Sequence, residues 1–543
     1  MNSKVLGAAT TLALLAVVGT SPSPAASASR TAPSAGLPLG APGLTETRTT
    51  RTLQPGVTLT RIVRGADAAA LAWTVELSIP GGATSPDPDA PPSALKDRAS
   101  ADELAAGVRA RGFDARVEDV RTPAVADFAG GSLGWRVRVG RYDSQASAAA
   151  GLAALRKAGF TGSALYTGWD GEATDRGPWR VDVLTIDPRR FRGGLTASYG
   201  PDLENRETTS ALANASGATA AVNAGFFVLD PKAGAPGDPA GAGVYRGRLL
   251  SEPVSGRPAL VLRDDARATG VARFTWTGRV TARGSSLALD GIDRVPGLIR
   301  NCGGTADDTP TSLPLHDVTC TDDDELVAFT PEYGQRTPAG EGLEAVRDAR
   351  GRVVELRSPR GGALPAGGSS VQATGDRVAA LAALARTGRP LRVETALRDD
   401  KGRRITPSPA TSVVNGGPEL VRDGRTHITA AADGMVQPDN PSFYYGWVHK
   451  RNPRTLAGVD AAGRTVLVTA DGRDTDALGL SIPEAAAVAR SLGLRDAINL
   501  DGGGSTTLVA GGEVLNDPSD AAGERPVSDA LLILPARRET APR

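Results

Sequence analysis

The sequence predicts an α+β protein, with a mixed-sheet domain flanked by helices and a small additional βαββαβ module. Hydrophobic residues make up 40% and charged residues 22% of the 543 residues, which is typical of a globular chain with two or three domains. Apolar alternation typical of strands recurs along the whole sequence. Between residues 70 and 168, one strand–helix–strand order occurs twice. Together these observations favour mixed α and β structure over either class alone.

The N-terminus has the pattern of a secretory signal. Lys4 precedes an apolar run from Val5 to Val18, and Ala26-Ser27-Ala28 is a suitable cleavage site. We therefore expect a signal peptide over residues 1–28 and a secreted protein that is extracellular or associated with the cell wall. Residues 29–53 are expected to form a disordered leader. No later run is long and apolar enough for a membrane span, so none is expected after signal removal.

Charge and cysteine content narrow the partners. Lys+Arg 61 balances Asp+Glu 61, so no global field attracts nucleic acid, and no nucleic-acid partner is expected. Cys302 and Cys320 are the two cysteines, and in an exported protein we expect them to form a disulfide worth on the order of 3 kcal/mol. With only three histidines, a structural zinc site is disfavoured.

A strand at Val57 to Val63 precedes the repeated part of the chain, and we assign residues 54–65 to it. In each repeat a Gly-Phe pair follows the helix, where Gly suits a left-handed helix stop and Phe covers the sheet. The first repeat predicts strand, helix and strand at Trp73 to Ile79, Asp102 to Arg111 and Ala115 to Val120. The second predicts them at Trp135 to Val139, Ser147 to Lys157 and Ser163 to Tyr166.

This duplicated layout, residues 70–168, resembles the sporulation-related repeat domain. The resemblance is clearest in Trp135 to Tyr142 and Ala146 to Gly159, whereas the Pro-rich stretch Pro80 to Pro92 interrupts the first repeat. It implies that the module binds peptidoglycan glycan strands, as such domains commonly do through an exposed sheet face. The alternative is a βαββαβ spacer without a ligand.

From Trp179 onward, strand and helix signals are mixed. Strands are expected at Trp179 to Ile186, Arg257 to Asp264, Leu326 to Thr330, Leu391 to Leu397, Arg464 to Thr469 and Ala497 to Leu500. Helices are expected at Thr208 to Ser216, Asp376 to Ala385 and Ile482 to Leu492.

Two of these strands end in an acidic glycine turn, Asp471-Gly472 and Asp501-Gly502. If the strands are parallel neighbours, both turns lie at one edge of the sheet, where α/β proteins usually bind ligands. Asp501 begins a run of three glycines and three hydroxyl residues. Glycines let the backbone approach a ligand closely and present free N–H groups to an anion.

Four motifs together resemble the phosphodiester glycosidase family, over most of Gly177 to Leu534. We therefore assign residues 177–536 to a catalytic domain and residues 537–543 to a tail. The strand over 54–65 looks like the family's first strand, which makes the repeat module an insertion. The motifs are Ala221-Val222-Asn223-Ala224-Gly225-Phe226-Phe227, Arg451-Asn452-Pro453-Arg454-Thr455, Ala470-Asp471-Gly472-Arg473 and Asn499-Leu500-Asp501-Gly502-Gly503-Gly504-Ser505-Thr506-Thr507.

The resemblance implies hydrolysis of the glycosidic bond of a sugar-1-phosphodiester, in cell-wall or exopolysaccharide material. The transition state of this reaction carries positive charge on the sugar and negative charge on the leaving phosphate. We assign the carboxylates to Asp471 and Asp501. Each is alternatively a turn-forming aspartate, or a ligand of a hard cation such as calcium. No cofactor is expected to be required, calcium is a possible exception, and no metal ligand is assigned.

The phosphate calls for cations and neutral donors. Arg454 and Arg473 are the candidates for a two-pronged grip on phosphate oxygens, and the alternative for each is a surface salt bridge. Asn223 is a candidate to fix a sugar hydroxyl or acetamido group. The remaining predicted substrate contacts are Thr455, Gly503, Gly504, Ser505 and Thr506.

Two other functions fit parts of the sequence. One is a non-catalytic cell-wall glycan-binding protein that keeps the glycosidase fold. The other is a phosphodiesterase that cuts the P–O bond on the far side of the phosphate.

Overall fold

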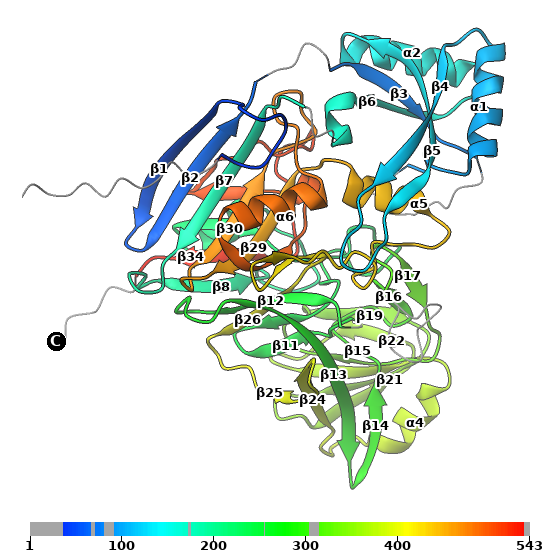
Figure 1. The fold of residues 1–543 in the computed structure, drawn as a ribbon. Coiled ribbons are helices and arrows are strands. Elements are labelled where there is room, and N and C mark those ends of the chain that lie inside the picture. Colours follow the sequence, from blue (N-terminus) through cyan, green and yellow to red (C-terminus); the bar gives the residue numbers. More distant parts are fainter. Residues whose placement is uncertain are drawn as a thin grey trace, which may run out of the picture. The chain divides into compact units, whose positions relative to one another are not determined.

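The structure is a computed structural model that describes residues 36–66, 71–80, 92–171, 175–254, 256–302 and 314–536. The predicted signal peptide, most of the Pro-rich stretch and the tail over 537–543 lie outside these ranges. Within them, no helix is long and apolar enough to cross a membrane. Strands dominate and several helices accompany them, which confirms the predicted α+β class (Figure 1).

The central sheet joins segments that lie far apart in the sequence. Blue β2 lies beside β7, which in turn lies beside orange β30 (Figure 1). Every neighbouring pair in this sheet is antiparallel. Its eight strands, in spatial order, are β1 (Glu46–Gln54), β2 (Val57–Arg64), β7 (Trp179–Ile186), β30 (Thr465–Ala470), β29 (Arg454–Asp460), β31 (Leu494–Asn499), β27 (Glu419–Arg422) and β28 (Arg425–Thr426).

The prediction of a disordered leader over 29–53 is wrong for the part that the structure describes. Strand β1 pairs with β2 over most of its length. Leu37 and Leu39 are buried in the same hydrophobic cluster as Trp179. Most side chains of β1 are exposed, as expected at a sheet edge, and this polar character explains why the strand resembled a leader.

Apolar side chains cover both faces of the central sheet. On one face, Val181, Val468 and Leu456 pack with helix α6 (Ile482–Ser491). Ser481 and Glu484 form a capping box at the start of α6, which satisfies its first free N–H groups. The other face packs on a five-stranded sheet in the order β33 (Glu513–Val514), β32 (Leu508–Ala510), β9 (Ala220–Asn223), β34 (Ala530–Leu534) and β8 (Gly194–Ser198).

Two larger sheets and two strand pairs complete the part that follows β9. The first sheet contains β11 (Arg248–Ser251), β10 (Gly243–Tyr245), β26 (Thr411–Asn415), β12 (Pro258–Arg263), β13 (Gly270–Ala282), β24 (Arg392–Asp399) and β25 (Arg404–Ile405), with β14 (Ser285–Leu289) on β13. The second contains β15 (Gly291–Ile292), β18 (Leu326–Phe329), β23 (Ser369–Ala373), β20 (Leu343–Arg347) and β21 (Val353–Arg357). The pairs are β16 (Leu298–Arg300) with β17 (Thr319–Thr321), and β19 (Arg336–Gly340) with β22 (Arg360–Ala363).

Short helices accompany these sheets. They are α3 (Thr209–Ala215), α4 (Arg377–Leu384), α5 (Pro441–Tyr444) and the π-helical turn η2 (Tyr445–His449). The predicted disulfide between Cys302 and Cys320 is present.

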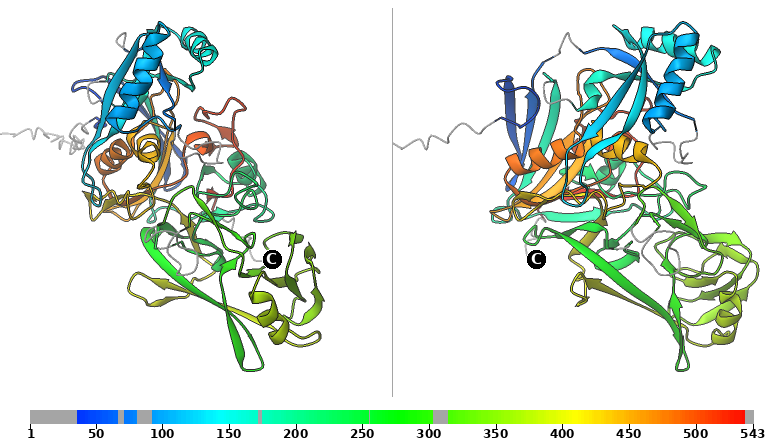
Figure 2. Two further views of the ribbon diagram at one scale, coloured as in Figure 1. Left: turned by 90° about the vertical axis from the view of Figure 1, so that its right-hand side faces the viewer. Right: turned by 45° about the vertical axis from the view of Figure 1, so that its right-hand side comes forward.

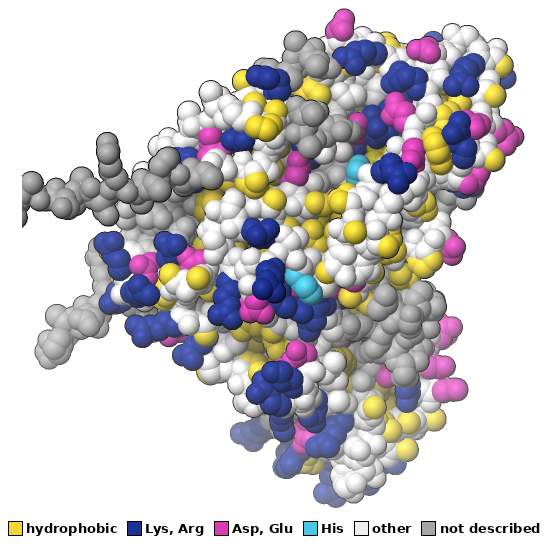
Figure 3. Space-filling model, viewed as in Figure 1, with side chains coloured by type: hydrophobic (Ala, Val, Ile, Leu, Met, Phe, Trp, Pro, Cys, Tyr) yellow, Lys and Arg dark blue, Asp and Glu magenta, His cyan; other side chains and the backbone are white. Residues whose placement is uncertain are grey.

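Acidic and basic side chains are both spread over the face shown in Figure 3, with Lys and Arg gathered over its lower part.

The inserted module has a four-stranded sheet with two helices packed on one face (Figure 2). Val75, Val137 and Val139 point to the helices and form the core of the module. The strands, in spatial order, are β4 (Ala115–Thr122), β5 (Gly131–Tyr142), β3 (Trp73–Leu77) and β6 (Gly162–Tyr166). The helices are α1 (Arg98–Ala110), α2 (Gln145–Lys157) and the 3-10 turn η1 (Thr167–Asp170).

The other face of this sheet carries charged side chains that are nevertheless buried. Glu76 on β3 is 5% exposed and Arg138 on β5 is 2% exposed. Arg138 donates to both Glu76 and Asp170, and Tyr445 and Lys450, from the part of the chain that follows the module, contact Glu76 as well. The expected exposed sheet face is therefore covered at its two central strands.

Candidate active site

The structure brings three of the four motifs to one edge of the central sheet, but not as predicted. Strands β30 and β31 are not neighbours, because β29 lies between them and runs antiparallel to both. Consequently β30 and β31 still end at the same edge, and β29 begins there. Arg454 pairs with Ala470, and Leu456 pairs with Asn499. The arginine motif thus lies between the two acidic glycine turns.

The glycine loop after β31 is held close to the start of β29. The N–H of Gly503 donates to the Pro453 carbonyl at 2.9 Å. Asp501 is half-buried, and one oxygen of its carboxylate accepts from the Gly502 N–H at 2.8 Å. Gly503 has φ +58, a left-handed conformation that favours glycine, and it opens the 3-10 turn η3 (Gly503–Ser505).

Asn223 joins this loop to the neighbouring strands. Its Nδ2 donates to the Asp501 carbonyl at 2.8 Å, and its Oδ1 accepts from the Thr455 hydroxyl at 2.6 Å and from the Thr507 N–H at 3.1 Å. Asn223 and Thr455 are both fully buried. The prediction that they contact substrate is therefore not supported, and the structure makes them positioning residues for the glycine loop.

A cavity of about 270 Å³ opens beside this loop. Arg454 and Arg473 line it together with the backbone of Gly502 and Gly503. Trp447, Lys450, Arg451 and Asn452 also line it, as do Pro92, Leu165 and Trp169 of the inserted module. The sequence did not identify either tryptophan, although Trp447 lies only four residues before the arginine motif.

The two predicted phosphate-binding arginines lie close enough to influence each other. Burial and the charge of Arg473 lower the pKa of Arg454 to about 9. The Arg454 guanidinium donates to the carbonyls of Leu480 and Trp447, at 3.0 and 2.5 Å. No carboxylate among the described residues forms an ion pair with Arg454. Its positive charge therefore reaches the cavity without direct neutralisation, which suits an anion.

Arg473 has a different environment. It is exposed, its backbone φ is +60, and its Nε donates to the Asn452 side-chain oxygen at 3.2 Å. A Cβ placed on Gly503 would lie 3.1 Å from Nη2 of Arg473. The guanidinium therefore packs directly against the glycine loop, and only glycine leaves it this room.

The two predicted carboxylates are placed differently. Asp501 immediately precedes the glycines that line the cavity. Asp471 is 6% exposed, does not line the cavity, and accepts hydrogen bonds from the Asn516 side chain and the Asp517 N–H at 3.1 and 3.2 Å. Burial raises the pKa of Asp471 to about 6, although these two hydrogen bonds oppose the shift.

Three further residues of the glycine loop, Gly504, Ser505 and Thr506, do not line the cavity. A Cβ on Gly504 would clash with the ion pair of Asp520 and Arg525, so Gly504 faces the following loop. Ser505 and Thr506 are buried, and their hydroxyls have no hydrogen-bond partner among the described residues. Of the eight predicted substrate contacts, only Arg454, Arg473 and Gly503 line the cavity.

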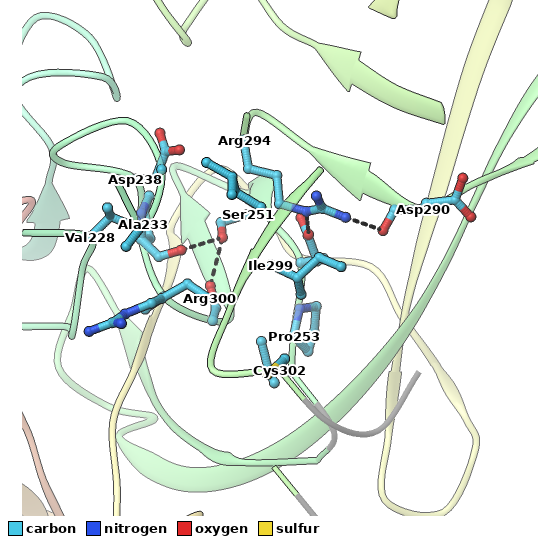
Figure 4. A pocket seen from close by; sticks show the side chains of 17 residues that line it. Val228, Ala233, Asp238, Ser251, Pro253, Asp290, Arg294, Ile299, Arg300 and Cys302 are labelled. Atoms are coloured by element: carbon cyan, nitrogen blue, oxygen red, sulfur yellow. Dashed lines mark hydrogen bonds and ion pairs between the residues drawn. The ribbon is translucent and has the colours of Figure 1, made fainter. Parts of the chain in front are cut away.

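No group of three or more His, Cys, Asp or Glu side chains in the described ranges is arranged to hold a metal ion. A second cavity, between the loop after β9 and the segment around Arg294, has a volume of only about 40 Å³ (Figure 4). Asp238 at its edge is 3% exposed, and burial raises its pKa well above the usual value. No residue of the four sequence motifs lines this second cavity.

Comparison with known families agrees with both parts of the chain. A phosphodiester glycosidase family model matches residues 342–534, and a SPOR domain model matches residues 93–166. Over 114 residues the sequence is 33% identical to the N-acetylglucosamine-1-phosphodiester alpha-N-acetylglucosaminidase of Mus musculus, and over 116 residues it is 33% identical to that of Homo sapiens. These matches span 21% of this chain and 22% of each relative.

Solved structures resemble a larger share of the chain. A Burkholderia pseudomallei protein described as exported is 36% identical, with a TM-score of 0.82, and the match covers 93% of this chain and 99% of that one. A Synechocystis protein shares the fold at 16% identity, with a TM-score of 0.51 over 91% of this chain and 81% of that one. Residues 342–534 of the chain therefore carry a phosphodiester glycosidase family match, and a SPOR domain lies between strands β2 and β7.

Proposed function

We propose that the protein is a secreted hydrolase that cleaves the glycosidic bond of sugar-1-phosphodiesters in cell-wall or exopolysaccharide material. One observation carries this proposal above the others. Arg454 and Arg473 line the same cavity as Gly502 and Gly503, at the sheet edge where the strands leading to Asp471 and Asp501 end. An anion site thus adjoins acidic turns, as the reaction requires.

The phosphate is held at the end of the cavity formed by the two arginines. Arg454 is buried and fixed by backbone carbonyls, so its guanidinium does not have to be ordered when the ligand binds, and Arg473 is oriented by its hydrogen bond to Asn452. The N–H groups of the glycine loop add neutral donors for the charge that develops on the leaving phosphate.

Asp501 is the carboxylate that we place nearest the anomeric carbon. A water oxygen forms the new bond to that carbon as the bond to the bridging oxygen breaks. The bridging oxygen leaves with the electron pair as part of a phosphate monoester, and the water proton passes to solvent or to a carboxylate. Asp471, whose pKa is raised to about 6, acts as a positioning residue through Asn516, which also donates to the Thr506 carbonyl.

The cellular setting of this activity is the less specific part of the proposal. The SPOR domain supports an association with peptidoglycan, and the likeness to an exported protein supports secretion. Fractionation of the producing cells tests secretion, and sedimentation of the purified protein with isolated cell walls tests the association. A protein found only inside cells would overturn this part alone.

The reaction is tested with a synthetic alkyl N-acetylglucosamine-1-phosphodiester in ¹⁸O-labelled water. We expect the label on the released sugar, since the C–O bond breaks. Label on the phosphate would instead identify a phosphodiesterase, and no turnover would leave a glycan-binding protein. We expect Asp501→Asn to abolish turnover while the protein stays folded.

We keep the expectation that no cofactor is required. The same assay with a chelator tests it, and lost activity that calcium restores would assign a calcium-dependent enzyme.

A further inference from the structure

The SPOR domain contributes directly to the cavity that holds the proposed substrate. Leu165 on β6, Trp169 on η1 and Trp447 line it together with the two arginines and the glycine loop. All three side chains are only partly buried. A cavity with phosphate-binding arginines and apolar aromatic walls can hold both parts of a sugar phosphate.

The position of Trp169 is fixed from both domains. Its indole N–H donates to the Asp474 carbonyl of the glycosidase domain at 3.2 Å. Within the SPOR domain, its ring contacts those of Trp73 and Tyr166, with centroids 5.5 and 6.0 Å away. The carbonyl of Trp169 also accepts from the Arg451 N–H, at 2.9 Å, at the start of the arginine motif. Trp169 is therefore a rigid part of the cavity wall.

The charged face of the SPOR sheet keeps this wall in place. Tyr445 donates to Glu76 at 2.8 Å and accepts from Arg136 at 2.7 Å. Burial opposes ionisation of Glu76, but Lys450, Arg138 and Arg136 outweigh it and lower its pKa to about 2. Separating the domains would take Tyr445 and Lys450 away from Glu76, and Tyr445 away from Arg136, in a cluster that is removed from water.

The contact extends beyond the charged cluster. The Ser442 hydroxyl accepts from the Leu95 N–H at 2.9 Å and donates to the Leu95 carbonyl at 3.5 Å. The rings of Phe128 and Tyr444 lie 4.7 Å apart. Asp127 accepts hydrogen bonds from the N–H groups of Ala431 and Ala432, at 3.1 and 2.8 Å. The SPOR domain is thus docked along the segment that leads into the arginine motif.

We propose that the SPOR domain acts as the sugar-selecting wall of the active site, with Trp169 and Leu165 packing on the apolar face of the pyranose ring. This inference rests on the proposed function and adds the element that chooses the sugar. The volume of about 270 Å³ lies near the lower limit for small-ligand pockets, roughly 300 Å³, which favours one sugar and its phosphate over a longer chain.

Equilibrium binding to the full-length protein, measured by calorimetry, separates the sugar from the phosphate. The probes are N-acetylglucosamine 1-phosphate and inorganic phosphate. We expect Trp169→Ala to weaken binding of the sugar phosphate about ten-fold or more and to leave phosphate binding unchanged. Trp135→Ala is the matched control, because Trp135 belongs to the same domain but stacks on Arg98 and does not line the cavity.

Equal effects of the two alanine variants would overturn the inference, as would wild-type protein that binds the sugar phosphate no more tightly than phosphate. Circular dichroism checks that the variants are folded. If Trp169→Ala is unfolded, Trp169→Phe replaces it, and we expect an intermediate loss because the ring remains while the bond to Asp474 is lost. Selective sugar binding without turnover would refute the proposed hydrolysis and still support the SPOR wall, whereas turnover unaffected by Trp169→Ala would refute the wall alone.

Discussion

The hydroxyl of Tyr445 lies 2.8 Å from Oε2 of Glu76, and this hydrogen bond joins the glycosidase domain to the SPOR sheet. Glu76 comes from a strand before the first glycosidase motif, and Tyr445 lies nine residues before Arg454. The buried carboxylate of Glu76 and the segment that leads into the arginine motif therefore hold each other in position.

Tyr445→Phe removes this hydroxyl and leaves Arg136 without one of its acceptors. We expect the free energy of unfolding to fall by about 2 kcal/mol, because a buried hydrogen bond to a charged group is lost. Tyr199→Phe is the control, since no hydrogen bond of the Tyr199 hydroxyl occurs among the described residues. Chemical denaturation measures both variants, and equal stabilities would contradict the role of Tyr445.

Gly503→Ala places a methyl group 3.1 Å from the Arg473 guanidinium and forces a left-handed φ on alanine. We expect kcat/KM on a sugar-1-phosphodiester to fall about ten-fold or more, since the arginine must move. Gly511→Ala is the matched control, with φ +67 and nothing within 4 Å of the added Cβ. Both variants bear a similar backbone cost of about 1 kcal/mol, so a similar loss of activity in both would show that the Arg473 contact is unimportant.

Asp471→Asn should stabilise the protein in a pH-dependent way. The carboxyl has a pKa of about 6 in the folded protein and 3.8 ordinarily, so the folded state binds more protons between these values and wild-type stability falls as pH rises through them. Asn cannot ionise, and we expect it to add on the order of 2 kcal/mol above pH 6 and little near pH 4. Exposed Asp476→Asn is the control, and a pH-independent difference for Asp471→Asn would contradict the assignment.

Thr455→Val keeps the shape of the side chain but removes the donor to Asn223. We expect a loss of about 1–2 kcal/mol in unfolding free energy and reduced activity, because Asn223 also holds the carbonyl of Asp501. Thr50→Val removes an exposed hydroxyl contact with Thr60 and should change stability by less than about 0.5 kcal/mol. Thermal melts and kinetics distinguish the two variants. If Thr455→Val changes stability and activity no more than Thr50→Val does, the positioning role of the Thr455–Asn223 hydrogen bond is refuted.

The disulfide of Cys302 and Cys320 closes a segment with a sequence separation of 18. In the loop-entropy model, its reduction should lower the unfolding free energy by about 3 kcal/mol. Melting with and without a reductant measures this, with the Cys302→Ser, Cys320→Ser double variant as the control that should not respond. A wild-type melting temperature insensitive to complete reduction would rule out a stabilising role.

The sequence predicted the buried strands and the common edge of the acidic turns. Strand β7 has the predicted bounds, since its apolar residues face two packed layers. Strand β1 was missed because its exposed Thr and Arg residues carry no burial pattern. The expectation that β30 and β31 are neighbours was wrong, because strand order depends on long-range pairing, which local periodicity does not reveal.

The sequence predicted which residues lie near the cavity better than it predicted what each of them contacts. The motifs identified Arg454 and Arg473 at the cavity, but Asn223 and Thr455 prove to be buried partners of each other. An Asn at a strand end has the same sequence signature whether it binds a ligand or a backbone. Glu76 and Arg138 likewise resemble surface charges of an amphipathic sheet, because the surface that covers them comes from residues more than 300 positions later.

Arg64 and Trp179, which flank the inserted domain, are paired Cα partners on adjacent strands. In the central sheet, the inserted domain of more than a hundred residues therefore takes the place of a hairpin loop between β2 and β7. An insertion at this point can be exchanged for another module, in evolution or in the laboratory, without changing the order of strands in the central sheet. A replacement module, however, must provide an acceptor for the Tyr445 hydroxyl in place of Glu76, and a side chain in place of Trp169 to line the cavity for a new sugar.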